Sequence, residues 1–365
     1  MMKPKVNVAI ISISLAKGGA ERFASLLSKM IEAENIAVHN IIINDAVDYD
    51  YKGKLYNLGT ASSSTFSVFK KIEKGYLLCK YLKNNNIDVV IDNRPRNHYI
   101  RELLTTLIYG SRRIIFVIHS FNFKNYFPSP QFLSQKLYRN ATKLVCVSKE
   151  IEEGIREKLG FLNTITIYNP YEVVDTVVAE KVSDNENYIL FFGRFDEKVK
   201  NFSLMLEAFS KSEIYKAGYC LYLLGEGPDL VFIQNKIKEL QLDEFVKILP
   251  FVKNPQEWIA KAKFTILTSQ YEGFPMSLVE SLAAGTPIVA VDCKSGPKEI
   301  VKPEHNGLLV ENHNAPELSK AMKRMIEDEN LYNFCKKNAS ESVEHLSLDT
   351  ISKQWKALIL FDTND

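Results

Sequence analysis

Runs of apolar and β-branched residues alternate with amphipathic stretches along almost the whole chain. The runs have the length and composition of buried strands, and 3.6-residue periodicity fills the gaps between them, as in ERFASLLSKMIEAE (21–34) and FSLMLEAFSKS (202–212). The strand-like runs are, in order, VNVAIISIS, HNIIIN, IDVVID, RRIIFVIH, KLVCVS, TITIYN, YILFFG, YCLYLLG, VKILPF, FTILTS and PIVAVD. This alternation predicts an α/β fold with parallel sheets covered by helices on both faces.

The polar segment 171–188 separates two such series. A chain of 365 residues that is 46% hydrophobic is long enough for two cores. We therefore predict two doubly wound, Rossmann-like domains facing a cleft, an N-terminal one over 1–170 and a C-terminal one over 171–348. The last segment, 349–365, contains a helix that we expect to return to the first domain.

Composition narrows the class of protein. The five cysteines are scattered and never form a C-x-x-C pair, which argues against a disulfide framework or a zinc site and favours a reducing cytoplasm. The first apolar run resembles the hydrophobic core of a signal peptide, but no small-residue cleavage site follows it. No apolar run approaches the roughly 20 residues needed to span a bilayer. We expect a cytoplasmic protein, with at most peripheral contact to the inner face of the cell membrane.

The net charge of +2 conceals an uneven distribution. Residues 70–143 carry 14 basic and 4 acidic side chains. Such a region is suited to anionic lipid, nucleic acid or a phosphorylated substrate, and it is equally compatible with an ordinary solvated surface.

A carboxylate stands on an apolar helix near residue 280. Pro275 suits a first helical turn and Gly285 the position after the last, so a helix is predicted over 275–284. The neighbours of Glu280 three and four positions away are Met276, Ser277, Ala283 and Ala284. A buried carboxylate needs a partner, and this helix offers no Lys or Arg. Either another part of the protein or a ligand supplies it.

In doubly wound sheets, ligands bind at the carboxyl ends of the strands, so the loops there are where chemistry is sought. In KGGAER, Gly18 and Gly19 allow close approach to the backbone at a helix start. In FFGRFDEKVKN, Arg194 and Lys200 are two cations able to clamp a diphosphate that must leave, or else surface residues.

Three further positions carry candidate chemistry. Glu272 lies in a loop with Gly273, either as a sugar ligand or as a helix cap, and the first-turn N–H groups of Ser277 and Leu278 could receive phosphate. Glu280 could accept hydrogen bonds from two vicinal hydroxyls such as those of a ribose. His119 directly follows the run IIFVI.

Two patterns are set aside. Asp48-Tyr49-Asp50 has the D-x-D form by which other sugar transferases hold a divalent metal, but it lies in a polar loop, and we expect no metal site. The GEGP sequence at 225–228 fails the dinucleotide fingerprint because Pro228 interrupts it.

The order of these motifs resembles that of the retaining glycosyltransferases of family 4, which have the GT-B fold. The resemblance rests on GGAE, a His after an N-domain strand, GR followed by K, GEGP, E-GFPMSLV-E and GTPIVA, and it covers nearly the whole chain. DCKSGPKEIV further resembles members that build cell-surface polysaccharides.

The resemblance implies a role for each motif. Glu280 would bind the donor ribose, and Glu272 would bind the donor sugar hydroxyls, aided by backbone groups at Gly273, Phe274 and Met276. Arg194 and Lys200 would hold the diphosphate, with Lys198 a competitor for the second role because the spacing is one residue shorter than usual. Gly18 and Gly19 would line the other side, His119 would lie against the transferring sugar, and the backbone at Phe251 and Val252 would pair with the base.

Members of this family generally need no metal and retain the anomeric configuration. The expected function is transfer of a hexose or N-acetylhexosamine from a nucleotide-diphosphate sugar, with UDP favoured, to a lipid-linked or glycan hydroxyl in surface polysaccharide biosynthesis. No cofactor and no nucleic acid partner are expected. The alternatives are a non-catalytic GT-B subunit that supports a partner enzyme, and a sugar-nucleotide epimerase.

Overall fold

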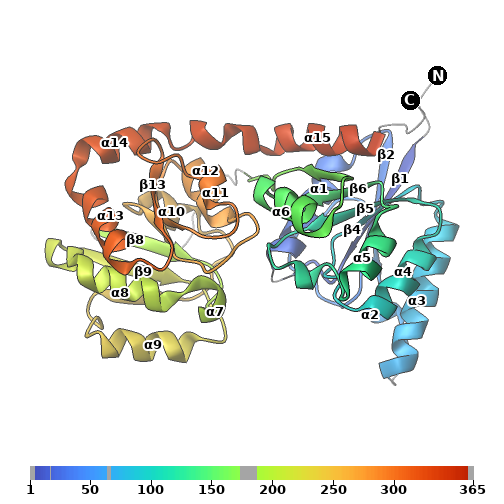
Figure 1. The fold of residues 1–365 in the computed structure, drawn as a ribbon, viewed down its shortest axis with the longest axis horizontal. Helices are drawn as coiled ribbons and strands as arrows, with labels where there is room; N and C mark the ends of the chain where they lie inside the picture. The colour runs from blue at the N-terminus through green and yellow to red at the C-terminus, as the bar shows by residue number, and fades with distance from the viewer. Residues whose placement is uncertain (1–4, 17, 64–66, 173–186, 361–365) are drawn as a thin grey trace. The chain divides into compact units, whose positions relative to one another are not determined.

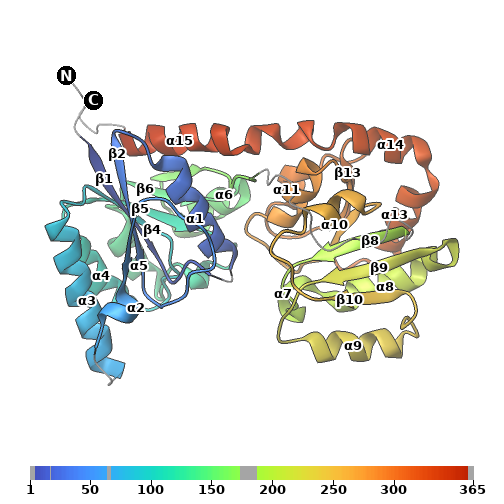
Figure 2. The same cartoon turned by 180° about the vertical axis from the view of Figure 1, so that it is seen from behind.

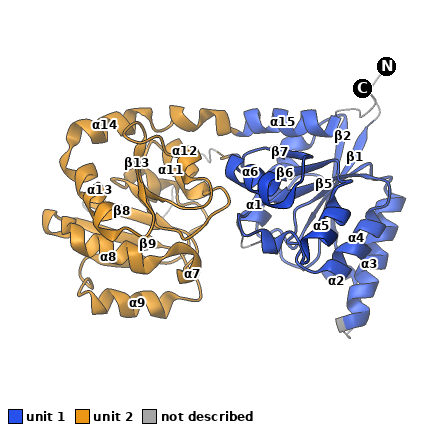
Figure 3. Cartoon of the chain, viewed as in Figure 1, with its two compact units in different colours: residues 1–170, 348–365 blue, residues 171–347 orange. Residues whose placement is uncertain are grey.

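The computed structural model describes residues 5–16, 18–63, 67–172 and 187–360. Figure 3 shows the chain divided into two compact units, residues 1–170 with 348–365 and residues 171–347. Most of the polar segment that predicts the boundary, 173–186, lies outside the described residues. Each unit is an α/β body built on one parallel sheet, so the predicted fold class is confirmed.

The first unit alternates strands and helices from its start (Figure 1). Its elements are β1 (Val6–Ser12), α1 (Gly19–Ile31), β2 (Ile36–Ile42), β3 (Lys54–Asn57), α2 (Leu58–Ala61), α3 (Ser67–Asn84), β4 (Val89–Asp92), α4 (Tyr99–Tyr109), β5 (Arg113–Ile118), η1 (Phe123–Asn125), α5 (Gln131–Tyr138), β6 (Lys143–Cys146), α6 (Lys149–Leu159), β7 (Thr164–Thr166) and α15 (Leu348–Leu360).

The strand order of the first sheet is β3-β2-β1-β4-β5-β6-β7, and all its pairings are parallel. The chain builds outward from β1 in one direction, then returns to place β4 on the other side of β1. This reversal is the topological switch point, where a doubly wound sheet leaves a crevice at its carboxyl edge. The loops after β1 and β4 flank it.

Helix α15 packs on α1 within the first unit. Its Trp355 is fully buried, with its ring centroid 5.9 Å from that of Phe23 on α1. Arg113, at the start of β5, donates to the carbonyl oxygens of Leu358 and Ile359 at 2.9 Å each. A cation at these last carbonyls satisfies groups that a helix C-terminus leaves without internal partners.

The second unit repeats the plan (Figure 2). Its elements are β8 (Asn187–Phe192), α7 (Glu197–Lys200), α8 (Phe202–Ser212), η2 (Ile214–Ala217), β9 (Tyr219–Leu224), α9 (Leu230–Glu239), β10 (Val246–Leu249), α10 (Gln256–Lys261), β11 (Thr265–Leu267), α11 (Met276–Ala283), β12 (Ile288–Asp292), α12 (Pro297–Ile300), β13 (Gly307–Glu311), α13 (Ala315–Glu327), α14 (Glu329–Asn338) and η3 (Glu341–Leu346).

The second sheet, in the order β10-β9-β8-β11-β12-β13, is covered on both faces. Alternate residues of one strand enter different cores: Ile189 and Phe191 of β8 pack with α8, α9 and α13, whereas Tyr188 and Leu190 pack with α10. Successive strand side chains point to opposite faces, so a strand buried on both sides is apolar throughout. The switch point here lies between β8 and β11.

Candidate functional site

Arg194 follows Gly193, the first residue after strand β8 of the second unit, at the switch point. Its side chain is exposed, and among the described residues it forms no ion pair or hydrogen bond. The GEGP loop after β9 packs tightly behind this position. A Cβ at Gly225 would lie 1.9 Å from the carbonyl oxygen of Gly193, and one at Gly227 would lie 2.2 Å from that of Phe195. These glycines therefore serve backbone packing that supports the Arg194 loop.

Lys200 ends the short helix α7, which is tied to the end of β11. Asn201 turns the chain with a left-handed φ of 53°, and its side chain accepts from Leu204 N at 3.2 Å to begin α8. The Thr268 hydroxyl donates to the carbonyl of Lys200 at 2.8 Å, and Gln270 N donates to that of Val199 at 2.8 Å. The backbone of Lys200 is thus held against the loop that carries Glu272.

The side chains of Lys200 and Glu272 meet directly. The distance from Lys200 Nζ to Glu272 Oε1 is 2.6 Å, and the Ser269 hydroxyl donates to the same oxygen at 2.6 Å. The two charged side chains are only 19% and 13% exposed, so this pair is screened less than a surface salt bridge. Lys198, on the same short helix, is exposed. Geometry brings Lys200, and not Lys198, to the acidic residue.

The Glu272 loop is braced by the segment that follows β12. Glu272 N donates to the Lys294 carbonyl at 2.7 Å, and the Ser295 hydroxyl donates to the Gly273 carbonyl at 2.8 Å. Gly296 adopts a φ of +101°, and a Cβ there would lie 2.6 Å from Pro275 Cδ. Only glycine tolerates both this positive φ and the close contact with Pro275. The DCKSGPKEIV segment therefore packs against the Glu272 loop and supports its conformation.

Helix α11 begins at Met276 and ends at Ala283, one residue inside each predicted boundary. Glu280 is 5% exposed and Phe274 is buried, whereas Met276 and Ser277 are partly accessible. One expectation is wrong: Leu278 N donates to the Pro275 carbonyl at 3.0 Å, so this amide is not free for phosphate. The tight first turn that follows Pro275 uses it internally.

Phe251 and Val252 follow β10 at the same carboxyl edge, on the far side of β9. Phe251 is 58% exposed. Val252 is half-buried and packs against the cluster that contains Tyr188 and Tyr222.

In the first unit, Gly18 and Gly19 lie at the start of α1, directly after the β1 loop. Gly18 is the N-cap, and a Cβ there would lie 2.1 Å from Glu21 Oε2, so the glycine lets this carboxylate fold over the helix start. Burial raises the pKa of Glu21. Gly19 is exposed, with no atom within 4 Å of a Cβ placed on it.

His119 follows β5 and is connected to the glycine loop through Asn93. Asn93 is 3% exposed and directly follows β4, and its Nδ2 donates to the Ala20 carbonyl at 2.7 Å. This bond orients the amide so that Oδ1 faces His119 Nε2, with which it forms a short hydrogen bond. An amide oxygen only accepts, so Nε2 carries the proton and Nδ1 keeps its lone pair. The Phe23 ring packs edge-on at 5.0 Å.

Burial, together with the cation of Arg96, lowers the pKa of His119 to about 3. The imidazole is therefore neutral at physiological pH, and it offers an acceptor rather than a charge. Asn93 was not singled out from the sequence. Its position immediately after the strand IDVVID is the signal that could have identified it, and a similar signal is the position of Ser269 at the end of the run FTILTS.

Arg96 is a buried cation near this histidine. It is 1% exposed, and its guanidinium donates to the carbonyls of Asp92, Arg94 and Val117 at 3.1, 2.8 and 3.1 Å. It also lies over the Phe116 ring, 4.7 Å from the centroid. A planar guanidinium suits this combination of carbonyl and ring contacts.

Only some of the basic side chains in region 70–143 are exposed on the surface. Arg94 pairs with Asp92 at 2.7 Å in the interior, and Arg96 is buried as described. Lys74 and Arg112 donate to backbone carbonyls, as does Arg113. These five cations are bonded within the protein, so they do not form part of a surface for an anionic partner.

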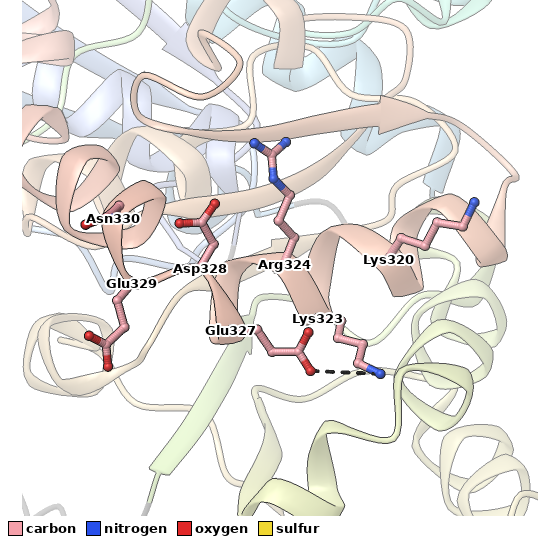
Figure 4. A pocket seen from close by; sticks show the side chains of 7 residues that line it. All are labelled: Lys320, Lys323, Arg324, Glu327, Asp328, Glu329 and Asn330. Atoms are coloured by element: carbon pink, nitrogen blue, oxygen red, sulfur yellow. Dashed lines mark ion pairs between the residues drawn. The ribbon is translucent and has the colours of Figure 1, made fainter.

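Two other features lie apart from these residues, the Asp48–Asp50 loop and a hollow in the second unit. Asp48 and Asp50 are exposed, and the described part of the chain holds no group of three or more His, Cys, Asp or Glu arranged for a metal ion. An open hollow of about 740 Å³ lies where α13 meets α14. Figure 4 shows the acidic and basic side chains that line it. Its Lys323 and Arg324 pair with Glu327 and Glu304 at 3.9 and 2.6 Å, and it contains none of the predicted site residues.

Comparison with known proteins gives the residues of each unit a context. The sequence profile described as "Glycosyl transferases group 1" matches residues 175–342. The N-acetylgalactosamine-N,N'-diacetylbacillosaminyl-diphospho-undecaprenol 4-alpha-N-acetylgalactosaminyltransferase of Campylobacter jejuni is 30% identical over 350 residues, 91% of this chain and 93% of the relative. The amylovoran biosynthesis glycosyltransferase AmsD of Erwinia amylovora is 24% identical over 97% of this chain and 99% of its own.

Among solved structures, a mutant TarM from S. aureus in complex with fondaparinux, alpha-GlcNAc-glycerol and UDP superposes with a TM-score of 0.78. The match covers 98% of this chain and all of the other at 16% identity, so it bears on the fold. The predicted resemblance to glycosyltransferases is confirmed, while membership of family 4 in particular stays a prediction. The chain thus belongs to the group 1 glycosyl transferases, and it is a glycosyltransferase with the GT-B fold.

Proposed function

We propose that this enzyme is a retaining, metal-independent transferase that moves a hexose or N-acetylhexosamine from a UDP-sugar to a lipid-linked or glycan hydroxyl in the synthesis of a surface polysaccharide. The observation that carries the proposal is the cluster of Lys200, Glu272 and Ser269, which lies in the loops after β8 and β11 at the switch point of the second sheet, as Arg194 does.

The cation pair fits the leaving diphosphate. Arg194 has no competing partner among the described residues, so its guanidinium is available for a phosphate fork. Lys200 lies on the short helix that follows the Arg194 loop, and its side chain is already paired with Glu272 at 2.6 Å. When a diphosphate arrives, Lys200 exchanges part of this pairing for phosphate oxygens. The positive charge then stabilises the negative charge that develops as the sugar leaves.

The same exchange releases the carboxylate of Glu272 for the donor sugar. An oxygen that no longer accepts from Lys200 can accept from a sugar hydroxyl, with Ser269 keeping the side chain oriented. Glu280 lies deeper, on α11, and we assign it to the ribose hydroxyls. We assign the donor sugar and diphosphate to the backbone amides of Gly273, Phe274, Met276 and Ser277. We assign the base to the backbone at Phe251 and Val252. Leu278 contributes through packing.

His119 contributes a neutral imidazole from the first unit. With Nε2–H donated to Asn93, its Nδ1 lone pair can accept from a sugar hydroxyl without adding charge near an oxocarbenium-like centre. Gly18 and Gly19 offer backbone at the start of α1 for the phosphate side. A departing phosphate oxygen then takes the acceptor's proton on the same face, which gives retention of configuration.

The printed names of the relatives support the acceptor class. One acts on a diphospho-undecaprenol-linked sugar, and another belongs to amylovoran biosynthesis. The TarM complex contains UDP, which supports the choice of base.

A screen of nucleotide sugars for slow donor hydrolysis tests the proposal. One UDP-sugar is expected to release UDP without any acceptor and in the presence of EDTA, and NMR of the first-formed sugar product should show the donor's anomeric configuration. Lys200→Ala and Arg194→Ala should lower the rate, whereas Lys198→Ala is the matched control. Inversion, or equal rates for Lys200→Ala and Lys198→Ala, would contradict the mechanism. An epimerised donor would indicate the alternative epimerase, and absence of UDP binding by calorimetry would indicate a non-catalytic subunit.

A further inference from the structure

Helix α4 in the first unit has its apolar side turned outward. Its buried residues are Glu102, Thr105 and Tyr109. The residues of its exposed stripe are Ile100 (73% exposed), Leu103 (38%), Leu104 (56%) and Leu107 (69%). The stripe repeats at positions i, i+3, i+4 and i+7, which marks one continuous helix face. An apolar face of this kind normally packs against a core, and here it is the polar face that does so.

Polar bonds explain how α4 is held. Glu102 lies 2.7 Å from Arg101 Nε and 3.6 Å from Arg94 Nη2, and the Tyr109 hydroxyl donates to Asp92 Oδ2 at 2.8 Å. This buried network fixes the helix to the sheet without using any leucine of the stripe. The leucines are therefore available for a partner outside the unit.

Helix α3 continues the same surface. Phe69, Ile72 and Tyr76 are each 65% exposed, and Lys80 and Lys83 extend their helix face toward the C-terminal end. The two helices lie side by side in both views of the fold (Figures 1 and 2).

Gly75 and Ile108 mark the contact between the helices, because a Cβ on the glycine would lie 3.5 Å from Ile108 Cδ1. On α3 and on α4 alike, the exposed stripe occupies the outer side of this contact. We call the combined surface of Phe69, Ile72, Tyr76, Ile100, Leu103, Leu104 and Leu107 the apolar face.

The charges around the apolar face have one sign. The exposed charged side chains of α3 and α4 are Lys71, Lys80, Lys83 and Arg101. The acids on these helices are engaged: Glu73 accepts from the hydroxyls of Ser62 and Ser63 at 2.6 and 3.1 Å, and Glu102 is buried. A second copy of this face would oppose cations with cations, which disfavours self-association. Anionic lipid complements both the charge and the apolar side chains.

We propose that the apolar face of α3 and α4 docks on an anionic phospholipid surface, with its leucine and aromatic side chains entering the boundary between headgroups and acyl chains and Lys80 and Lys83 meeting lipid phosphates. Such docking is interfacial: in the described part of the chain, no helix combines the length and the apolarity required to span a bilayer. The inference goes beyond the proposed transfer reaction and does not depend on the donor.

Vesicle co-sedimentation of the full chain tests the docking. Wild-type protein should sediment with vesicles of phosphatidylglycerol and phosphatidylcholine and remain in solution with phosphatidylcholine alone. The pair Lys80→Glu with Lys83→Glu should weaken binding by roughly 30-fold or more, since each basic residue near such a surface contributes about fivefold. The pair Leu104→Gln with Leu107→Gln should weaken it by about tenfold. All four side chains are exposed, so the fold should tolerate these changes.

Matched controls lie elsewhere on the molecule. Val231→Gln and Leu162→Gln alter apolar side chains that are 66% and 85% exposed, and Lys320→Glu with Lys323→Glu reverses another i, i+3 lysine pair. These variants should bind vesicles like wild type. Failure of wild type to sediment with the anionic vesicles would overturn the proposal, as would wild-type binding by both test pairs.

A loss of dimer in light scattering for the leucine pair, with vesicle binding unchanged, would assign the face to a second copy and also overturn the proposal. Donor hydrolysis without vesicles should be unchanged in every variant. It therefore reports on the transferase function independently of the docking.

Discussion

Acid should destabilise the first unit through His119, and substitution by glutamine should remove this sensitivity. The folded ring binds its proton only near a pKa of about 3, against 6.5 for the ordinary side chain. Between these values the unfolded state takes up more protons than the folded state. Stability from this group is therefore complete above the unfolded pKa and is lost progressively as the pH falls toward the folded pKa.

The size of the effect follows from the shift. Between pH 7 and pH 5 the unfolded ring gains most of a proton, while the folded ring stays neutral. The free energy of unfolding falls mainly over the interval between the unfolded pKa and pH 5, which is about 1.5 pH units. At about 1.36 kcal/mol per unit, this amounts to roughly 2 kcal/mol. The imidazole is partly exposed, and solvent screening reduces the figure, so we expect wild type to lose about 1 to 2 kcal/mol more than His119→Gln. Glutamine can still donate to Asn93, so its own cost at neutral pH should be small.

The chain contains a probe for this measurement. Trp355 is fully buried on α15 against Phe23, which in turn contacts the His119 ring. In a Trp258→Phe background, Trp355 is the only tryptophan, and its fluorescence during urea unfolding at pH 7 and pH 5 reports on the first unit. The control is His98→Gln, which alters an exposed histidine of the same unit. Equal loss of stability in wild type and His119→Gln would refute the assignment of a buried, neutral ring.

The remaining predictions concern the reaction. Lys200→Ala should lower kcat by roughly 30- to 1,000-fold, about 2 to 4 kcal/mol of barrier, while Lys198→Ala changes it little, as steady-state kinetics can establish. Glu280→Ala should weaken UDP binding in calorimetry while leaving the thermal unfolding midpoint within a few degrees. Glu272→Gln should bind UDP up to about fivefold more tightly, because Lys200 loses its competing partner, and should turn over the UDP-sugar more slowly. Asn93→Ala should lower kcat and change the His119 tautomer seen by nitrogen NMR.

Strand prediction failed at two places, and both are sheet edges. β3 (KLYN) and β13 (GLLVE) are absent from the runs picked out by composition, and they terminate the first and second sheets. An edge strand is covered less completely, so it does not need an unbroken apolar run. Lys54 is exposed in β3, and Glu311 is exposed in β13. The interior strands were all found because burial on both faces demands apolar residues throughout.

The sequence located the site loops better than it described their bonding. The strand pattern indicated that Glu272 and Lys200 follow neighbouring strands. Their 2.6 Å pairing is accompanied by a hydrogen bond from the Thr268 hydroxyl to the Lys200 carbonyl, which has no sequence signature. The Leu278 amide was misjudged for a similar reason, because first-turn geometry decides which N–H groups stay free.

Charge counting misled most in the DNRPRN segment. Arg94 and Arg96 there read as part of a basic surface, yet both are buried, one with Asp92 and one on backbone carbonyls. Composition cannot separate a cation that faces solvent from one that satisfies the interior, because the difference lies in partners brought by the fold. The segment also hides Asn93, whose amide joins the glycine loop to His119.

The two acids of the 272–280 stretch separate into different physical classes. Glu272 is paired with a cation and a hydroxyl in a loop, where a ligand can change its partners at little cost to the fold. Glu280 is buried on a regular helix, where the surrounding packing restricts its carboxylate. A carboxylate that changes its hydrogen-bond partners during sugar transfer is better placed in the loop, as Glu272 is. A carboxylate that binds a part of the donor that does not react is better placed on the helix, as Glu280 is. This difference in mobility is the reason to assign the sugar to Glu272 and the ribose to Glu280.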